Sequence, residues 1–160
     1  MNRTWLGSVL LIAGSLAAQG GLDQAAARAR SAWLAHDPRA RIVWAHVGWD
    51  RTGHRTPELC RRLLRSHPNL YMDVKLDPGS PGKNRLLLPG PRPTVHPEWL
   101  QLFRDFPDRF VMGSDQHYPE PATGPQRWEA IAALLRALPP DVQRKMGTEN
   151  ANRLLSRETR

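Results

Sequence analysis

Three ionisable side chains, His46, Lys75 and Asp115, each stand at the end of a short apolar run. Imidazole and carboxylate groups are the usual carriers of protons in catalysis, so these residue types could do acid–base chemistry if they met. His46 and Asp115 are 69 positions apart in the chain. Only the fold can bring His46 and Asp115 together. Whether it does so depends on the strands and helices that contain these residues.

The apolar runs alternate with segments of helical pattern. Each run is rich in β-branched, aromatic or other apolar residues, which predicts strands over 41–46, 70–75 and 109–114. Capping residues, initial prolines and apolar spacing predict helices over 25–34, 57–66, 97–106, 126–138, 141–146 and 149–155. This alternation predicts an α/β fold in which parallel strands deliver His46, Lys75 and Asp115 to one rim.

Each candidate also has a structural interpretation. His46 could be a hydrogen-bonded structural histidine, and Asp115 could be a turn or cap residue after Gly113-Ser114. Period-two alternation puts Tyr71, Asp73 and Lys75 on one face of their strand, so Asp73 and Lys75 could form a structural ion pair. His117 lies two residues beyond Asp115, near the rim, with its direction undetermined. No glycine-rich phosphate-binding motif follows any of the strands.

Composition excludes several classes of protein. The 160 residues carry a net charge of +8, with 23 basic and 15 acidic residues, and the basic ones are almost all scattered arginines. They form no basic stripe interleaved with aromatics, so we expect no nucleic acid as the main partner and interpret them as a solvated surface. The single cysteine, Cys60, excludes an internal disulfide framework and a zinc finger. The connection over 77–96 is rich in glycine, serine and proline, which predicts an irregular segment.

The N-terminus has the pattern of an export signal over residues 1–18. Arg3 precedes an uncharged apolar run over 5–18, and Ser15-Leu16-Ala17 supplies small residues at a cleavage-site spacing. The run is too short for a stable membrane span, and a buried helix or an incorrectly assigned gene start are the alternatives. We expect a helical segment over 19–40 after it. The protein would then be periplasmic or secreted, and cytoplasmic if the run is no signal.

Four segments in order resemble the last third of an amidohydrolase-related (amidohydrolase 2) protein. This group includes metal-dependent hydrolases and aminocarboxymuconate-semialdehyde-type decarboxylases, and the resemblance covers about 37–155. The segments are Ile42-Val43-Trp44-Ala45-His46-Val47-Gly48, Pro68-Asn69-Leu70-Tyr71-Met72-Asp73, Arg109-Phe110-Val111-Met112-Gly113-Ser114-Asp115 and Glu149-Asn150-Ala151-Asn152-Arg153-Leu154-Leu155.

The resemblance implies a (β/α)₈ barrel with one divalent metal, usually zinc, at its carboxyl rim. The three predicted strands would be strands six to eight of a partial barrel domain over 41–156. Asp115 would bind the metal and help to handle the proton of its water, and His46 would lie beside the metal and hydrogen-bond the water or substrate. Lys75 and His117 are predicted to contact a small-molecule substrate. The implied reaction is hydrolysis of a C–N or C–O bond, or non-oxidative decarboxylation, through a metal-activated water.

The chain departs from the family pattern before residue 41. It contains no His-x-His pair, and a complete barrel takes about 250 residues. We therefore expect the last three βα units only, an incomplete metal site, and little activity from this chain alone. The alternatives are a non-catalytic fragment or binding module that keeps the rim and, with less support, an arginine-rich nucleic-acid binder. An open sheet would leave Trp44, Tyr71 and Met112 exposed on a poorly covered face, so we expect self-association or a partner that supplies the missing half of the barrel.

Overall fold

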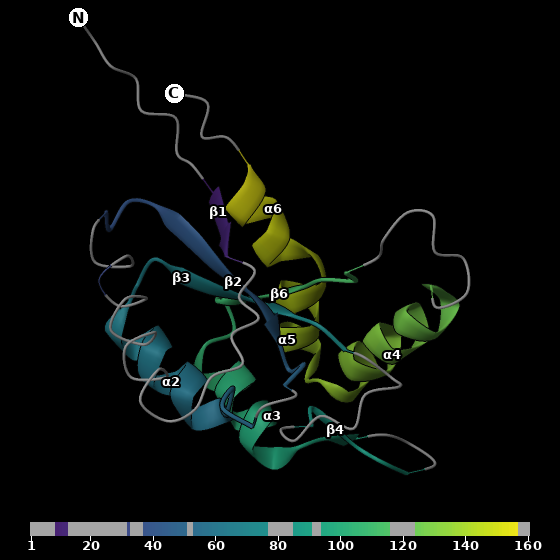
Figure 1. Ribbon diagram of the computed structural model, residues 1–160. Coiled ribbons are helices and arrows are strands. Elements are labelled where there is room, and N and C mark those ends of the chain that lie inside the picture. The colour runs from purple at the N-terminus through teal and green to yellow at the C-terminus, as the bar shows by residue number, and fades with distance from the viewer. Residues whose placement is uncertain are drawn as a thin grey trace, which may run out of the picture.

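The computed structural model describes residues 9–12, 32, 37–50, 53–76, 85–90, 94–115 and 124–156 (Figure 1). One parallel sheet has the strand order β1-β2-β3-β6, and a short antiparallel pair joins β4 to β5. The strands are β1 (Val9–Ile12), β2 (Arg41–Val47), β3 (Leu70–Val74), β4 (Leu87–Leu88), β5 (Thr94–Val95) and β6 (Phe110–Met112). The helices are α2 (Pro57–Ser66), α3 (Pro97–Asp105), α4 (Gly124–Ala137), α5 (Pro140–Arg144), the π-helical turn η1 (Lys145–Glu149) and α6 (Asn150–Leu155).

The sheet confirms the α/β prediction and the parallel order of the three predicted strands. Leu70 of β3 pairs with Ile42 of β2, and Phe110 of β6 pairs with Met72 on the other side of β3. The sheet is open rather than closed into a barrel. Its fourth strand, β1, comes from the apolar run at the N-terminus and pairs in parallel with β2. The helix predicted over 25–34 lies outside the described residues, except for position 32.

Local sequence signals explain the helix boundaries. The Thr56 hydroxyl accepts a hydrogen bond of 3.1 Å from the Leu59 N–H, and Pro57 occupies the first turn, where a missing N–H costs nothing. Helix α2 ends at His67, as the turn residues there predict. Arg61 on α2 forms an ion pair with Asp105 on α3, which joins the two crossover helices on one side of the sheet (Figure 1).

The main core lies between the sheet and helices α2, α3, α4 and α5. Trp44 is only 6% exposed in this core, and Met112 packs against it, so the prediction that these two side chains lie exposed on the uncovered face is wrong. Alternation along each strand directs them to the side of the helices instead. The core includes Ile42, Val47, Leu63, Leu64, Leu70, Met72, Val74, Trp99, Leu102, Phe103, Phe110, Leu134, Leu138, Val142 and Met146.

Helix α6 covers the opposite face of the sheet. Its Leu154 packs with Val43 and Val111 in a second cluster, against which Tyr71 and Ala151 are partly buried. The Arg41 guanidinium donates to the carbonyls of Arg153 and Leu154, each at 2.9 Å, and so ties β2 to the end of α6. The prediction that this face is poorly covered is therefore wrong where α6 lies across it.

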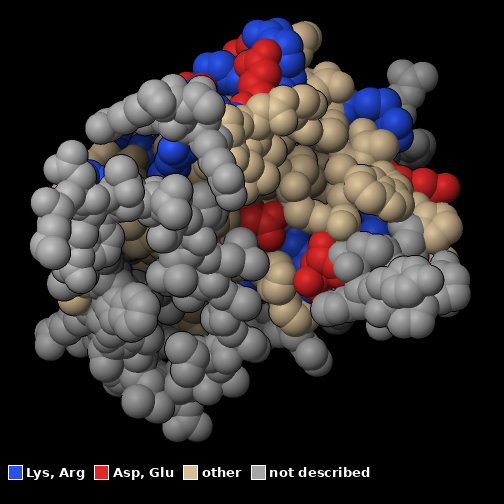
Figure 2. Space-filling view, turned by 90° about the horizontal axis from the view of Figure 1, so that it is seen from above, with Lys and Arg blue, Asp and Glu red and all other residues tan. Residues whose placement is uncertain are grey.

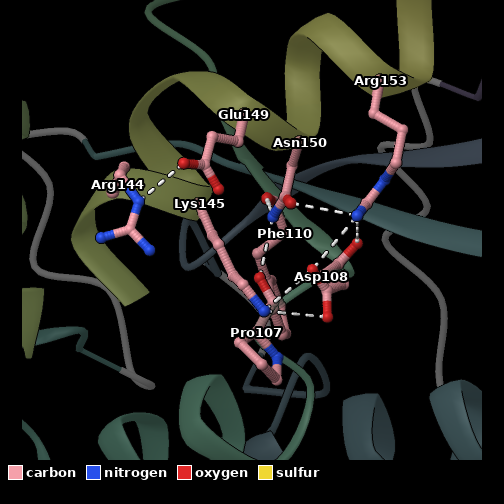
Figure 3. Close-up of polar contacts among 8 residues, drawn as sticks. All are labelled: Pro107, Asp108, Phe110, Arg144, Lys145, Glu149, Asn150 and Arg153. Atoms are coloured by element: carbon pink, nitrogen blue, oxygen red, sulfur yellow. Dashed lines mark hydrogen bonds and ion pairs between the residues drawn. The ribbon is translucent and has the colours of Figure 1, made fainter. Parts of the chain in front are cut away.

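The C-terminal segment is one continuous helical stretch rather than two separate short helices. Helix α5 continues through the π-helical turn η1 into α6. Asn150 is 1% exposed, and its amide donates to the carbonyls of Pro107 at 2.8 Å and Phe110 at 2.7 Å (Figure 3). Around it, Asp108 forms ion pairs with Lys145 at 3.1 Å and Arg153 at 3.2 Å. These contacts anchor the segment to the amino end of β6.

The connection that follows β3 contains a small hairpin, which the sequence prediction of an irregular segment missed. Leu86 precedes β4, is 2% exposed, and accepts a backbone hydrogen bond from His96. It packs onto Gly48, whose φ of +91° suits glycine, and a Cβ there would come 2.1 Å from the Leu86 side chain. The hairpin is thereby seated against the turn that follows β2. None of the described helices is long and apolar enough to cross a membrane.

Candidate functional site

An irregularity at the end of β2 sets the direction of His46. The pairing register shifts between Trp44 and Val47, so both of these side chains enter the helix-side core although they are three residues apart. His46 lies within this shift and has a left-handed backbone with φ +67°. A bulge of this kind re-aims a side chain at a sheet edge. Strict alternation would have sent His46 into the core beside Trp44.

Asp115 has the second left-handed backbone at the same rim, with φ +47°. Among the described residues, His46 and Asp115 are the non-glycine positions with positive φ. Histidine and aspartate tolerate this region better than most residues, but it still costs free energy and is concentrated at functional sites. The backbone leads into Asp115 through Gly113, whose N–H donates to the Val74 carbonyl at 3.1 Å.

The rim brings together the three residues predicted from strand ends. His46 Nε2 lies 3.3 Å from Asp115 Oδ1, and the Lys75 ammonium donates to Asp115 Oδ2. The exposed fractions of the three side chains are 24% for His46, 19% for Asp115 and 7% for Lys75. The carboxylate of Asp115 thus joins an imidazole to an ammonium in a partly shielded place. Such an arrangement can accept, hold and return a proton.

Trp49 packs against two of these residues. Lys75 Nζ lies 4.0 Å from the centroid of the Trp49 ring, and the His46 ring meets Trp49 edge-on at 5.9 Å between centroids. A cation over an indole face is attracted by the ring and held in a partly desolvated position. The sequence offered no signal for this role, because Trp49 lies in the loop after the strand.

Asp73 is a second carboxyl group below the rim, on the central strand β3. Burial raises the pKa of Asp73, and the nearby Asp115 carboxylate acts in the same direction, while a hydrogen bond from the His46 backbone and the Lys75 ammonium act against this rise. Its Oδ1 is buried without a hydrogen-bond partner in the described structure. A Cβ on Gly113 would come 2.0 Å from that oxygen, so only glycine leaves room for the carboxyl. Asp73 therefore sits between the ends of β2 and β6.

The loop that follows β2 holds the backbone of His46 from outside the strand. Asp50 is 2% exposed, and its carboxylate accepts hydrogen bonds of 2.9 Å from the N–H groups of Gly53 and Arg55. The Arg55 guanidinium donates to the His46 carbonyl at 2.9 Å. Arg127 on α4 makes the corresponding contact to the Asp115 carbonyl at 2.6 Å. Sequence reasoning treated these arginines as solvated surface and so missed both.

The donor set of the described residues does not by itself fit a divalent metal. Catalytic zinc takes three protein ligands, whereas His46 and Asp115 supply two, and the second oxygen of Asp115 is bonded to the Lys75 ammonium. Within the described ranges no group of three or more His, Cys, Asp or Glu side chains could hold a metal ion. His117, a predicted substrate contact, lies outside the described residues.

Cys60 is not a second reactive centre. It is fully buried in helix α2, and burial raises the pKa of its thiol to about 12. A thiol in this state is not a nucleophile at neutral pH. The chemistry of the described chain is therefore concentrated at the rim formed by β2, β3 and β6.

Comparison with known proteins gives a family match over most of the chain. The family model described as amidohydrolase matches residues 14–157, which is most of the chain. No curated protein and no solved structure matches it. The match spans all three strands that carry His46, Lys75 and Asp115. The chain belongs to the amidohydrolase family.

Proposed function

We propose that this chain carries the proton-handling part of an amidohydrolase-type hydrolase. Family membership suggests a hydrolase, and β2, β3 and β6 would correspond to strands six, seven and eight of the family barrel. The observation that carries the proposal is the 3.3 Å contact between His46 and Asp115 across strands far apart in sequence. Both residues adopt a left-handed backbone conformation there, which costs free energy and is found more often at functional sites than elsewhere.

The proposed chemistry is transfer of a proton from an attacking water. The Asp115 carboxylate would take the proton as the water oxygen bonds to the substrate carbon, while the His46 imidazole orients the water or substrate. The proton would then move from Asp115 across the 3.3 Å contact to His46, which would give it to the leaving group as the C–N or C–O bond breaks. Lys75 would hold the Asp115 carboxylate in place through their ion pair. Members of the family typically use a metal, but the described donors are too few for one, and no step here is assigned to a metal.

The substrate would be a small molecule with a hydrolysable C–N or C–O bond, or a carboxylic acid that loses CO₂. Lys75 remains a proposed contact to substrate, because an ammonium has three N–H donors and Asp115 is the described acceptor for one. His117 is proposed for the same role from its position in the sequence after Asp115. The choice between hydrolysis and decarboxylation depends on the substrate.

The second candidate is a binding module that keeps the rim without catalysis. The open sheet and the incomplete donor set favour it. A nucleic-acid function has less support, because acidic and basic side chains lie next to each other on the face in Figure 2, and the described residues of that face form no continuous basic area. A hydrolase assay separates the two leading candidates.

The test of the hydrolase proposal supplies the missing strands. Residues 37–156 would be fused behind the first five βα units of a complete amidohydrolase and assayed with that enzyme's substrate. We expect activity in the fusion and little in the chain alone. Asp115→Asn should abolish the activity of the fusion, and His46→Ala should lower kcat by about 10²-fold or more. The first five βα units of the fusion bring metal donors of their own, so His46→Ala should change the zinc content of the fusion less than it changes the rate.

The matched control is Asp108→Asn, which removes a carboxylate from the opposite end of β6. It should leave kcat within about threefold of the parent fusion, because its partners are Lys145 and Arg153 rather than rim residues. An active fusion that keeps its rate after Asp115→Asn would refute the proposal. A folded fusion without any activity would favour the binding module.

A further inference from the structure

We infer that the Lys75 ammonium is the resident cation of the site and holds the position at Asp115 that a divalent metal would need. The family uses a metal as the positive charge beside this kind of carboxylate, and the described donors do not fit one. Here a side chain of the protein supplies that charge. The inference concerns cation binding and does not depend on the proposed hydrolase activity.

The burial of Lys75 is the first observation. The residue is 5% exposed, although lysine is rarely buried without a partner. Its ammonium bonds to Asp115 Oδ2 and lies 4.0 Å from the centroid of the Trp49 ring. A carboxylate and an aromatic face therefore hold the charge where water has little access, which is the environment of a bound cation.

The backbone keeps Lys75 in this place. Its N–H donates to the Val47 carbonyl at 3.0 Å, which continues the pairing of β3 with β2 beyond the last strand residue. The alternation of β3 puts Lys75 on the same face as Asp73, the face that leads to the rim. The ammonium at the end of this side chain is then held by two groups at once, the Asp115 carboxylate and the Trp49 ring.

Charge explains why a metal and this lysine exclude each other. A divalent ion bound to Asp115 would sit within a few ångströms of the ammonium, and two positive charges at that distance repel strongly in a shielded site. Breaking the pair would also leave Lys75 buried and without its carboxylate partner, which is costly. The His46 imidazole and Asp115 would remain as the available donors, too few to compensate.

The experiment measures zinc binding by calorimetry and by metal analysis after dialysis. The wild-type chain should show no zinc binding that depends on Asp115. Asp115→Asn should therefore leave the zinc content of the chain unchanged. Lys75→Met, which keeps most of the side-chain volume, should bind zinc at least about tenfold more tightly than the weakest binding that calorimetry can measure for the wild type, because the repulsion is removed. Asp115→Asn in the Lys75→Met background should remove this gain. Lys75→Arg keeps the charge and should behave like the wild type.

Lys145→Met is the matched control, because Lys145 is also paired with an aspartate, Asp108, but far from the rim. It should leave zinc binding unchanged. A wild-type chain that binds one zinc and loses it on Asp115→Asn would overturn the inference. Equal zinc affinity of folded Lys75→Met and wild type would overturn it too.

A second measurement keeps the inference testable if Lys75→Met does not fold. Acetylation of the wild-type chain, followed by mass spectrometry, should modify Lys75 much more slowly than Lys145, because Lys75 is buried and Lys145 is partly exposed. Added zinc should leave the rate at Lys75 unchanged. A zinc-dependent rise at Lys75 alone would show that the metal displaces the ammonium, and the inference would fall.

Discussion

Arginine side chains fix the backbone at both candidate catalytic residues. Arg55 holds the carbonyl of His46, and Arg127 holds the carbonyl of Asp115, each from a different element. A planar guanidinium with five donors can bind carbonyls at defined angles, which a lysine cannot do as well. The arginine-rich composition thus contributes to the geometry of the rim, where left-handed backbone has to be held against its intrinsic cost.

At the same scale, Asp73 should make stability depend on pH. Burial raises the pKa of Asp73 above its value of 3.8 in the unfolded chain, so the folded state binds the proton more tightly. The contribution of Asp73 to the stability of the folded state is complete below pH 3.8. It is lost as the pH rises through the pKa of Asp73 in the folded state. Relative to wild type, Asp73→Asn should therefore gain stability as the pH rises from 3.8 to neutral, since its side chain cannot ionise.

Urea unfolding of both proteins at pH 4 and pH 7 checks this prediction. The quantity to compare is the difference in free energy of unfolding between the variant and the wild type at each pH. A difference that is the same at both values, or that favours the wild type more at pH 7, would contradict it.

Gly113 should tolerate no larger residue while Asp73 is present. In Gly113→Ala the new Cβ would meet Asp73 Oδ1 at 2.0 Å, so we expect a loss of about 1–3 kcal/mol from overpacking. The loss should shrink in the Asp73→Ala background, as a double-mutant cycle of urea unfolding would show. Gly147→Ala is the control, because its nearest neighbour, Leu135, is 3.6 Å away and no clash arises.

At the scale of elements, the side-chain amide of Asn150 is the most deeply buried of the contacts that anchor the C-terminal helix to β6. Asn150→Ala removes the hydrogen bonds to the carbonyls of Pro107 and Phe110 and leaves both without this donor in a buried place. We expect a loss of about 2–3 kcal/mol in the free energy of unfolding. Asn152→Ala, an exposed position on the same helix, should stay within about 0.5 kcal/mol of wild type. Equal effects of the two substitutions would contradict this account.

The N-terminal apolar run that contains β1 fits both the pattern of an export signal and the pattern of an edge strand. A short uncharged apolar run fits an export signal, and four of its residues also fit beside β2 as an edge strand. Export remains a proposal that N-terminal sequencing of the mature protein would test. Cleavage after residue 17 would remove β1 and leave β2 at the edge of the sheet.

At the scale of the whole molecule, the open sheet should promote self-association. Its outer strands, β1 and β6, each pair with one neighbour in the described sheet, and Trp128 and Leu155 are 58% and 68% exposed. We expect sedimentation velocity to show concentration-dependent oligomers or dependence on a partner that supplies further strands. A monodisperse monomer with a sharp cooperative melt would contradict this expectation.

The sequence by itself determined the three strands β2, β3 and β6 and the helices that connect them, but not β1 or the hairpin of β4 and β5. Thr56 and Pro57 mark the start of α2, and the apolar runs mark β2, β3 and β6, because capping and periodicity are properties of neighbouring residues. Parallel order then follows from the alternation of strands and helices, and with it the convergence of His46, Lys75 and Asp115 at one rim. Local chemistry was sufficient for these predictions.

Only the tertiary structure decided what each rim residue contacts. The bulge at His46 depends on how β2 pairs with β3, and the placement of α6 over Val43 and Val111 depends on contacts more than 40 residues apart in the chain. The bonding of Lys75 to Asp115 likewise spans 40 positions. Such contacts have no period or local motif, since they arise from packing between elements, and the sequence carries them only through the complete fold.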